Sequence, residues 1–317
     1  MNSIPISVVM SVHNDEQFLE KAIRSILEQN FTNYQYIIID DHSTDRSPEI
    51  LQKYAALDSR IRLITNEINL GLTRSLNIGL AESDTPYIAR IDSDDIACSD
   101  RLEVQYSYLE SNPDITLLGS GCTMINEQGE KLYRFKPITD EEKLKREFKK
   151  KNCIYHSSVM FRNDKETRYR DKFIYSQDYD LYLSMLSRGK RIINIPDALI
   201  YYRIHSNAIS ITKKAKQKLF TEKAREFYVQ RLTREEDDYF GFDPETILNL
   251  DVEHSNNKII LFEEIKAGII TNNMKWVRTY CIKYFRFHGI CNKIIFYYIL
   301  SFFPVCVVKF IKKILKK

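Results

Sequence analysis

The sequence predicts an α/β fold with a mostly parallel, doubly wound sheet and a helical C-terminal extension. Strand-like and helix-like segments alternate through the first third of the chain, as in folds whose helices connect parallel strands. Two predicted strands end in clustered aspartates, and ligands bind at the carboxyl ends of strands in such sheets. Beyond Ser210 the composition changes to long, lysine-rich helical patterns, with no glycine between Gly189 and Gly241.

The length and composition are those of a globular protein with more than one part. The chain has 317 residues, of which 44% are hydrophobic and 28% charged, which excludes a disordered or fibrous protein. We expect an α/β domain over residues 1–212 and a helical domain over residues 213–317. The net charge of +4 gives no electrostatic argument for a nucleic-acid partner.

The cysteines and the first residues indicate a cytoplasmic protein. None of the six cysteines forms a CxxC pair, which favours free thiols in a reducing compartment over a zinc site or a disulfide framework. The chain enters a predicted strand within a few residues and shows no basic-then-apolar signal segment. We therefore expect a cytoplasmic location.

Apolar periodicity predicts the elements of the first half. β-Branched apolar runs indicate strands, and apolar residues three and four apart indicate helices. The expected strands are 6–12, 34–39, 60–64 and 87–91, and the expected helices are 18–27, 48–57, 72–79, where Gly79 would end the helix, and 101–110.

The same patterns continue to about residue 210. The helix over 178–188 should end at Gly189, since glycine adopts the left-handed conformation of a helix C-terminus. The other expected elements are strands 115–124, 131–135, 157–161, 192–195 and 199–203, and a charged helix 139–151.

Three carboxylates follow the predicted strand 87–91. Asp92, Asp94 and Asp95 lie within four residues, and acids this close repel one another unless a cation or hydrogen-bond donors hold them. Mg²⁺ and Mn²⁺ prefer such oxygen ligands. A solvated acidic turn explains the same spacing, so both interpretations stay open on the spacing alone.

Polar residues also follow the first two predicted strands. The segment Ser11-Val12-His13-Asn14 ends one strand, and Asp40-Asp41 ends the next. In a parallel sheet these ends share one edge with Asp92, where acids can accept hydrogen bonds from a base or a ribose. The chain lacks GxGxxG near the first strand and GxxxxGK[ST] anywhere, which argues against a dinucleotide site and a P-loop.

Taken together, the motifs resemble those of the inverting family 2 glycosyltransferases of the GT-A fold. The resemblance covers roughly residues 4–210. It rests on Ser-Val-His-Asn (11–14), Asp-Asp-His-Ser-Thr-Asp (40–45), Asn-Leu-Gly-Leu-Thr-Arg-Ser-Leu-Asn-Ile-Gly (69–79), Ala-Arg-Ile-Asp-Ser-Asp-Asp (89–95) with Arg101-Leu102, Gln-Asp-Tyr-Asp-Leu (177–181) and Tyr-Tyr-Arg-Ile-His (201–205).

The resemblance implies a site for a UDP-sugar and for Mn²⁺ or Mg²⁺. Asp92 and Asp94 match the DxD motif of the family, with Asp94 and His205 as metal ligands and Asp95 as a structural acid. Exchanged roles of Asp94 and Asp95, and a contact of His205 with the diphosphate, are the alternatives. Arg74, implied below as a donor-binding residue, has an exposed helix cation as its alternative interpretation. The alternative for His205 is a structural histidine. The implied donor-binding residues are Val12, Asn14, Asp41 towards the uracil imide, Arg74 towards the diphosphate and Asp92 towards the ribose.

The resemblance also implies that Asp178 is the general base. The family usually has Glu-Asp where this chain has Gln177-Asp178, so the base is retained and the contribution of the glutamate is not. An acid favoured by a helix N-terminus is the alternative interpretation of Asp178. His156 would line the pocket, and Asp180 would be exposed on the far side of the helix.

An apolar segment with flanking lysines lies near the end of the chain. Residues 294–308 read IIFYYILSFFPVCVV, and lysines precede and follow them. This run is shorter than the ~20 residues of a spanning helix, and it suits a segment that lies in the inner leaflet of a membrane. A buried helix with a solvated basic end is the alternative.

These observations predict an inverting transfer of a sugar from a UDP-sugar to a hydroxyl of a surface glycan such as capsule, O-antigen or lipooligosaccharide. The acceptor would be a glycan or a lipid-linked oligosaccharide. Two alternatives remain. A metal-dependent nucleotidyltransferase should show a glycine-rich basic loop after the first strand, and residues 11–18 contain no glycine. A non-catalytic sugar-nucleotide or glycan-binding protein has Gln177 as its only indication.

Overall fold

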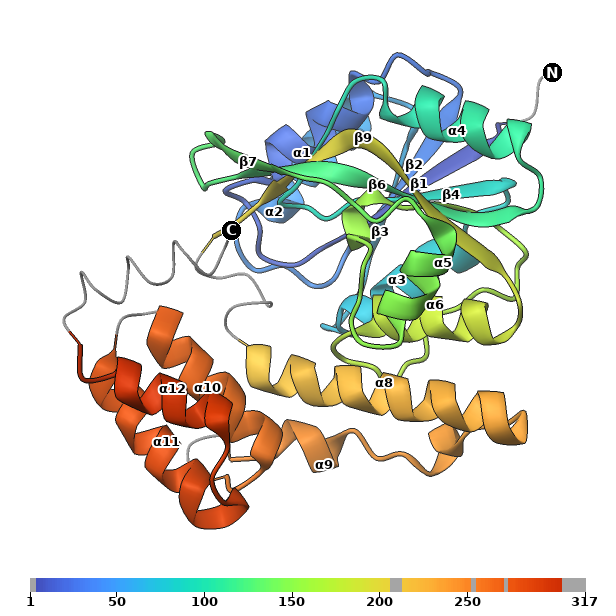
Figure 1. The fold of residues 1–317 in the computed structure, drawn as a ribbon. Coiled ribbons are helices and arrows are strands. Elements are labelled where there is room, and N and C mark those ends of the chain that lie inside the picture. Colours follow the sequence, from blue (N-terminus) through green and yellow to red (C-terminus); the bar gives the residue numbers. More distant parts are fainter. Residues whose placement is uncertain (1–3, 206–212, 252–254, 271–272, 304–317) are drawn as a thin grey trace. The chain divides into compact units, whose positions relative to one another are not determined.

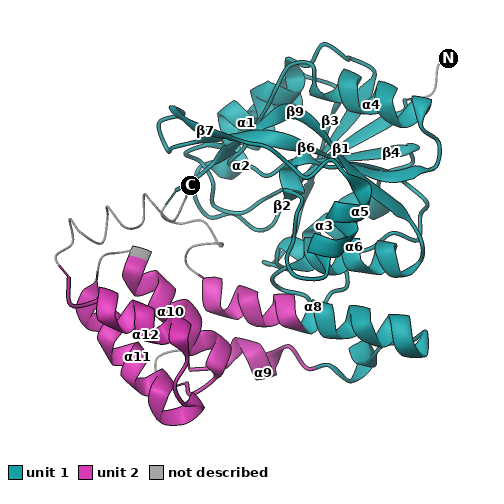
Figure 2. Cartoon of the chain, viewed as in Figure 1, with its two compact units in different colours: residues 1–208, 223–242 teal, residues 209–222, 243–317 magenta. Residues whose placement is uncertain are grey.

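The computed structural model describes residues 4–205, 213–251, 255–270 and 273–303. The chain divides into two compact units, residues 1–208 with 223–242 and residues 209–222 with 243–317 (Figure 2). The helix α8 (Lys214–Arg234) has residues in both units. The domain boundary at residue 212 stays a prediction.

The first unit is built on one sheet that confirms the predicted α/β fold. Among the described residues the strand order is β3-β2-β1-β4-β8-β6-β9-β5, and β7 pairs with β6. The neighbours β3, β2, β1 and β4 are parallel, as are β6 and β9, whereas β8, β5 and β7 pair antiparallel. The strands are β1 Ile6–Val12, β2 Tyr34–Asp40, β3 Ile61–Thr65, β4 Tyr87–Arg90, β5 Ile96–Ala97, β6 Ile115–Ile125, β7 Lys131–Phe135, β8 Met160–Arg162 and β9 Arg191–Arg203.

Helices cover both faces of this sheet (Figure 1). Side chains of α1, α2 and α4 share a core with Val8 and Met10 of β1, and α3 packs on the opposite face against Val9. Each residue of β1 is buried, which explains why that strand reads as a continuous apolar run. The helices are α1 Leu19–Leu27, α2 Ser47–Leu57, α3 Leu72–Ala81, α4 Arg101–Ser111, α5 Glu141–Phe148 and α6 Gln177–Ser187.

The helix that we expected to end at Gly79 continues through it to Ala81. A Cβ atom at Gly79 would lie 2.5 Å from Val9 Cγ1 and 2.8 Å from Ile39 Cδ1. The glycine therefore allows α3 to approach β1 and β2 closely, and it is not a helix C-terminus. Gly189, in contrast, has φ +73° just after α6, as predicted.

Two other predicted segments differ in the structure. The expected strand 157–161 is a 3₁₀ turn (His156–Ser158) followed by β8, because Ser158 N–H and Oγ both bond to Tyr155 O at 2.9 and 2.8 Å. The expected strands 192–195 and 199–203 form the single strand β9. Its pairing with β6 shifts register near Pro196, where proline cannot donate to the ladder.

The described residues of the second unit are helical. Leu261, Val277 and Ile294 belong to a core that α10, α11 and α12 share. Among the described residues, no helix is long and apolar enough to cross a membrane. Of the predicted apolar segment 294–308, residues 304–308 lie outside the described residues, as do the terminal lysines. The remaining elements are η2 Asp238–Gly241 in the first unit, and α9 Glu245–Leu248, α10 Lys258–Ile270, α11 Met274–His288 and α12 Asn292–Leu300 in the second.

Candidate active site

The ends of β1, β2 and β4 lie on one edge of the sheet, as predicted. Val12 pairs with Asp40 in the parallel register of β1 and β2, and Val9 pairs with Arg90 in that of β1 and β4. Just beyond β4, Asp92, Asp94 and Asp95 each offer an oxygen atom, and these atoms lie within 4.8 Å of one another. Carboxylate oxygens at this spacing are suited to a hard divalent cation.

Asp92 is held by the protein on both oxygens. Its Oδ1 is paired with Arg90, which is only 1% exposed, and its Oδ2 accepts from Ser157 Oγ at 2.6 Å. Burial acts to raise the pKa of Asp92, but Arg90, His156 and Ser157 together hold it below its ordinary value. These contacts stabilise the ionised form of Asp92.

The structure brings the two predicted metal ligands together. His205 Nε2 lies 2.9 Å from Asp94 Oδ2, and this hydrogen bond raises the pKa of His205. The His205 ring packs against Phe18, with 5.1 Å between centroids. Both side chains are therefore oriented towards the same position at the end of β4.

Asp95 lies inside the protein beneath this pair. It is 1% exposed, and Oδ1 accepts from the backbone N–H of Arg203 at 2.8 Å. Its other oxygen has no hydrogen-bond partner within the described part of the chain. Burial, with the charges of Asp94 and Asp92, raises its pKa well above the ordinary value. A cation at the cluster would stabilise the ionised form of Asp95 and so lower its pKa.

Asp15 is a further acid of the same site that was not expected from the sequence. The pair Asn14-Asp15 has the residue types of a helix cap, which explains Asp15 without a role in the site. Burial and then the charge of Asp94 raise the pKa of Asp15 to about 7, with Asp92 and His205 also acting on it. The position of Asp15 just after β1 was the available signal, because the ends of β1 and β4 share an edge.

Asp41 lies at the end of β2 and fastens the loop before α3. It is 2% exposed. Its Oδ1 accepts from Leu70 N–H and Asn66 Nδ2, and its Oδ2 accepts from Gly71 N–H, each at 2.8 Å. A carboxylate has about four lone-pair sites, so one remains. The predicted contact with a uracil imide stays a prediction.

Val12 and Asn14 connect the end of β1 to the segment after β2. The Val12 carbonyl accepts from Asp41 N–H at 2.8 Å. Asn14 has φ +52°, and its Oδ1 accepts from Thr44 N–H at 2.7 Å. Next to them, His13 Nδ1 lies 2.8 Å from the Asp41 carbonyl oxygen. These contacts set the shape of the edge where we expect the nucleotide.

Arg74 lies in the first turns of α3, just beyond the loop that Asp41 holds. Its side chain is exposed, and within the described residues no hydrogen bond or ion pair is found for it. A cation without a partner at this position is available to a diphosphate. Its predicted role stays a prediction.

Asp178 is the second residue of α6. Its pKa is affected by Asp92, one of the three acids Asp92, Asp94 and Asp95 that we call the acidic cluster. Its Oδ2 accepts from Asn152 Nδ2 at 2.6 Å. Burial raises the pKa of Asp178 to about 6, and the charge of Asp92 acts in the same direction, against hydrogen bonds from Tyr179 N–H and Asn152. Asp178 is thus more basic than an ordinary aspartate and still ionised at neutral pH, as a general base requires.

The neighbours of Asp178 correct one expectation and clarify another. Asp180 is fully buried and paired with Arg170, so the prediction that it is exposed was wrong. His156 Nε2 lies 2.7 Å from Tyr169 OH. Burial and the nearby Arg90 lower the pKa of His156 to about 3, so it is neutral near pH 7.

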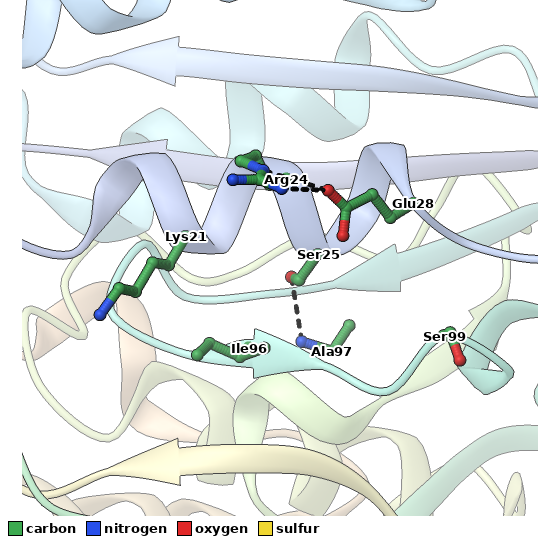
Figure 3. Close-up of a pocket in the computed structure, with 7 residues that line it drawn as sticks. All are labelled: Lys21, Arg24, Ser25, Glu28, Ile96, Ala97 and Ser99. Carbon is green, nitrogen blue, oxygen red and sulfur yellow. Dashed lines mark hydrogen bonds and ion pairs between the residues drawn. The ribbon is translucent and has the colours of Figure 1, made fainter. Parts of the chain in front are cut away.

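A surface hollow lies elsewhere on the first unit, between α1 and β5 (Figure 3). Arg24 and Glu28 form an i,i+4 pair along α1 on one side of it, and Ala97 N–H donates to Ser25 Oγ at 3.0 Å. None of its lining residues is a predicted site residue, and one of its two cations, Arg24, is already paired with an acid. We therefore assign the hollow no part in the chemistry at the strand ends. It is lined by Lys21, Arg24, Ser25, Glu28, Ile96, Ala97 and Ser99.

Comparisons with known proteins agree with this geometry. The family described as "Glycosyl transferase family 2" matches residues 7–168. An uncharacterized glycosyltransferase of Methanocaldococcus jannaschii is 36% identical over 221 residues, which are 68% of this chain and 76% of that protein. The O-antigen biosynthesis glycosyltransferase WbnJ of Escherichia coli is 34% identical over 232 residues, which are 71% of this chain and 90% of that protein.

A solved structure shares the fold. S. aureus TarS 1–349, crystallised in complex with UDP-GlcNAc, superimposes with a TM-score of 0.55 at 15% identity, over 94% of this chain and 90% of that one. The predicted GT-A type of fold is confirmed by this similarity.

The raised pKa of Asp178 leads to a prediction about stability. The folded protein holds a proton on Asp178 up to about pH 6, whereas the ordinary pKa is 3.8. The stability that this proton contributes is complete below pH 3.8 and is lost as the pH rises through about 6. Asp178→Asn has no proton to lose, so it should gain stability over the wild type across this window, by at most about 3 kcal/mol.

Urea unfolding at about pH 4 and about pH 8 measures this difference. Asp197→Asn, an exposed aspartate of β9, is the matched control and should show no pH-dependent gain. A difference between Asp178→Asn and the wild type that is the same at both pH values contradicts the raised pKa.

Proposed function

The chain belongs to glycosyl transferase family 2, and from this premise we propose that it moves a sugar from a UDP-sugar to a hydroxyl of a growing surface glycan, with inversion. The observation that carries the proposal is Asp178, a half-buried carboxylate in the first turn of α6 that accepts from Asn152 Nδ2. Desolvation raises its pKa to about 6, and Asp92 of the acidic cluster acts in the same direction. The E. coli relative, named for O-antigen biosynthesis, supports a surface glycan or its lipid-linked precursor as the acceptor.

The residues at the ends of β1 and β2 are our candidates for the donor site. Val12 and Asn14 would line the nucleotide pocket, and Asp41 would use its remaining lone pair for the uracil imide. Arg74 would meet the diphosphate, since its side chain is exposed and otherwise unpaired within the described residues. The TarS complex with UDP-GlcNAc supports a uridine nucleotide, although that likeness extends only to the fold.

Asp178 would act as the general base. Ionised above about pH 6, it would accept the proton of the acceptor hydroxyl as that oxygen attacks the anomeric carbon. Asn152 would keep the other carboxylate oxygen in a fixed orientation. Attack from the side opposite the diphosphate, without a covalent intermediate on the enzyme, inverts the anomeric configuration.

The acidic cluster fits a hard divalent cation, for which we propose Mn²⁺ or Mg²⁺. Asp94 and His205 would hold it, and the unpartnered oxygen of buried Asp95 points to a missing positive charge nearby. Such a cation supplies charge neutralisation for the departing diphosphate. Asp92, with one oxygen on Arg90 and the other on Ser157, would keep its orientation towards the ribose, and its remaining lone pairs would accept from the ribose hydroxyls.

We propose that the helical unit also contacts the inner face of an anionic membrane. The chain has nine lysines, two arginines and no acidic residue from Ile265 to Lys317. On α12, Phe296 and Ile299 are 43% and 54% exposed, and Phe303 just beyond it is 46% exposed. Apolar side chains one turn apart among cations match the requirements of a membrane surface.

Asp178→Asn tests the base. We expect UDP-sugar binding to be kept and transfer to fall by two or more orders of magnitude, since general base catalysis contributes about 10²–10⁴-fold. Transfer and donor affinity are measured on the same preparation, with Asp197→Asn as the control. Transfer at the wild-type rate contradicts the assignment of the base, and a wild-type protein that binds donors without any turnover indicates a non-catalytic binding protein.

Chelation tests the metal. With EDTA, the activity should fall to background, and added Mn²⁺ or Mg²⁺ should restore it. Asp94→Asn should need more Mn²⁺ for half-maximal activity than the wild type, because one charged ligand is lost. Full activity in excess chelator refutes the metal site.

Flotation with vesicles tests the membrane contact. The intact chain should float with vesicles that contain an anionic phospholipid and stay behind with phosphatidylcholine alone, and a chain that ends at Asn292 should not float. Phe296→Ser with Ile299→Ser should weaken flotation, whereas Phe240→Ser, which changes an exposed aromatic of the first unit, should leave it unchanged. Equal flotation of the intact and shortened chains excludes this segment as the anchor.

A further inference from the structure

A buried ion-pair network lies behind α6, in the part of the first unit that follows the family match. Arg170 Nε donates to Asp180 Oδ2 at 2.8 Å, and its Nη2 pairs with the other oxygen of Asp180. The third nitrogen, Nη1, donates to Asp237 Oδ2 at 2.7 Å. One guanidinium thus joins α6 to a segment almost sixty residues away.

Aromatic rings surround this guanidinium. It lies over the rings of Tyr239, Phe227 and Phe173, with distances of 4.4, 5.0 and 5.2 Å to their centroids. Tyr239 and Phe227 come from the same 223–242 segment as Asp237. Rings that exclude water strengthen both ion pairs, and they hold Arg170 in a single position.

The network fixes α6 at its N-terminal end. Asp180 is fully buried, with both oxygens on Arg170, so it cannot move away without leaving a buried charge unpaired. Asp180 is two residues after Asp178 in the same helix, and a helix moves as a rigid element over this length. The position of Arg170 therefore sets the position of the Asp178 carboxylate.

The same segment holds the C-terminal end of α6. Arg231 pairs with Asp237, and its Nε donates to Ser187 Oγ, in the last residue of α6, at 2.9 Å. Asp237 thus accepts from two arginines, one of which reaches the first turn of α6 and the other the last. Residues 223–242 therefore hold the first turn of α6 through Arg170 and bond directly to its last residue.

The loop that carries Arg170 is tied to α3 as well. Thr73 Oγ1 donates to the Phe173 carbonyl at 2.6 Å, and Asn77 Nδ2 donates to the Tyr169 carbonyl at 2.8 Å. Since α3 carries Arg74, the loop connects the helix of the proposed donor contact with the helix of the proposed base.

We propose that residues 223–242, together with Arg170, form a brace that positions the general base, with Arg170 and Asp237 as its positioning residues. The brace acts on α6 through Asp180 and Ser187, and no direct role toward the substrate is assigned to Arg170 or Asp237. This inference rests on the proposed role of Asp178. It assigns a catalytic contribution to a segment that lies beyond the residues of the family match.

Asp237→Ala is the first test, and Asp238→Ala, the adjacent aspartate with a 69% exposed side chain, is its matched control. We expect Asp237→Ala to lower kcat by about ten- to a hundredfold, since a 1 Å misplacement of a catalytic group costs up to 10²-fold. The donor KM should be unchanged, because the loop of Arg170 keeps its own bonds to Thr73 and Asn77 of α3 when Asp237 is removed. Asp238→Ala should keep both values.

The amount of UDP that each variant binds measures the fraction of its molecules that are folded. Calorimetric titration gives the number of UDP molecules bound per chain, and kcat is expressed per binding site, so that loss of folded protein cannot imitate loss of positioning. Arg170→Met should lower kcat per UDP-binding site by about as much as Asp237→Ala does. Arg170→Lys keeps the charge but loses the fork geometry of the guanidinium, so its kcat per site should be between those of Arg170→Met and the wild type.

The outcomes separate the brace from the proposed function. Loss of kcat per UDP site in Asp237→Ala and Arg170→Met, with donor KM unchanged, supports the brace. Wild-type kcat per site in both variants overturns it, even when Asp178→Asn is inactive. If Asp178→Asn itself transfers at the wild-type rate, the proposed function fails first, and the brace fails with it.

Discussion

The structure at the end of β4 depends on how the charges of three neighbouring carboxylates are balanced. Asp92, Asp94 and Asp95 place oxygens within 4.8 Å of one another, so each makes the ionisation of the others less favourable. The chain offsets this with arginines that are themselves buried. Arg90 pairs with Asp92, and Arg203 donates its backbone N–H to Asp95 and its Nε to the Asp94 carbonyl. A buried arginine is as unfavourable alone as a buried acid, so the acids and arginines require one another for this edge to fold.

Much of the fold and part of the site followed from the sequence because they depend on local patterns. Strand and helix periodicity is local, and parallel pairing of β1, β2 and β4 then brings their ends together whatever the details of packing. The pairing of Asp94 with His205 was implied by the family resemblance, and the structure places the two side chains within hydrogen-bond distance. The donor residues were identified in the same way, and their ligand contacts remain predictions.

The features that the sequence analysis missed depend on burial and on partners far along the chain. Asp180 looked like an exposed helix acid because its partner, Arg170, belongs to a loop with no regular pattern, and Asp237 lies farther away still. Gly79 looked like a helix end because its actual constraint, the closeness of Val9, exists only after α3 docks on the sheet. Asp15 was taken as a cap because capping is local and its proximity to Asp94 is not. In each case the deciding interaction joins segments that no window of sequence contains.

The electrostatics of the site also bear on how the proposed base, Asp178, would keep its basicity beside the proposed metal. A divalent cation near the cluster lowers the pKa of every acid that it reaches, and a less basic Asp178 would accept a proton less readily. The largest cause of the raised pKa of Asp178 is burial, and the charge of Asp92 comes after two hydrogen bonds. The environment of Asp178 that excludes water is made by protein groups, and the charge of Asp92 is already paired with Arg90, with a further hydrogen bond from Ser157. The basicity of Asp178 therefore depends on how deeply α6 places it, and the contacts that hold α6 in place matter as much for the chemistry as the residues that face the substrate.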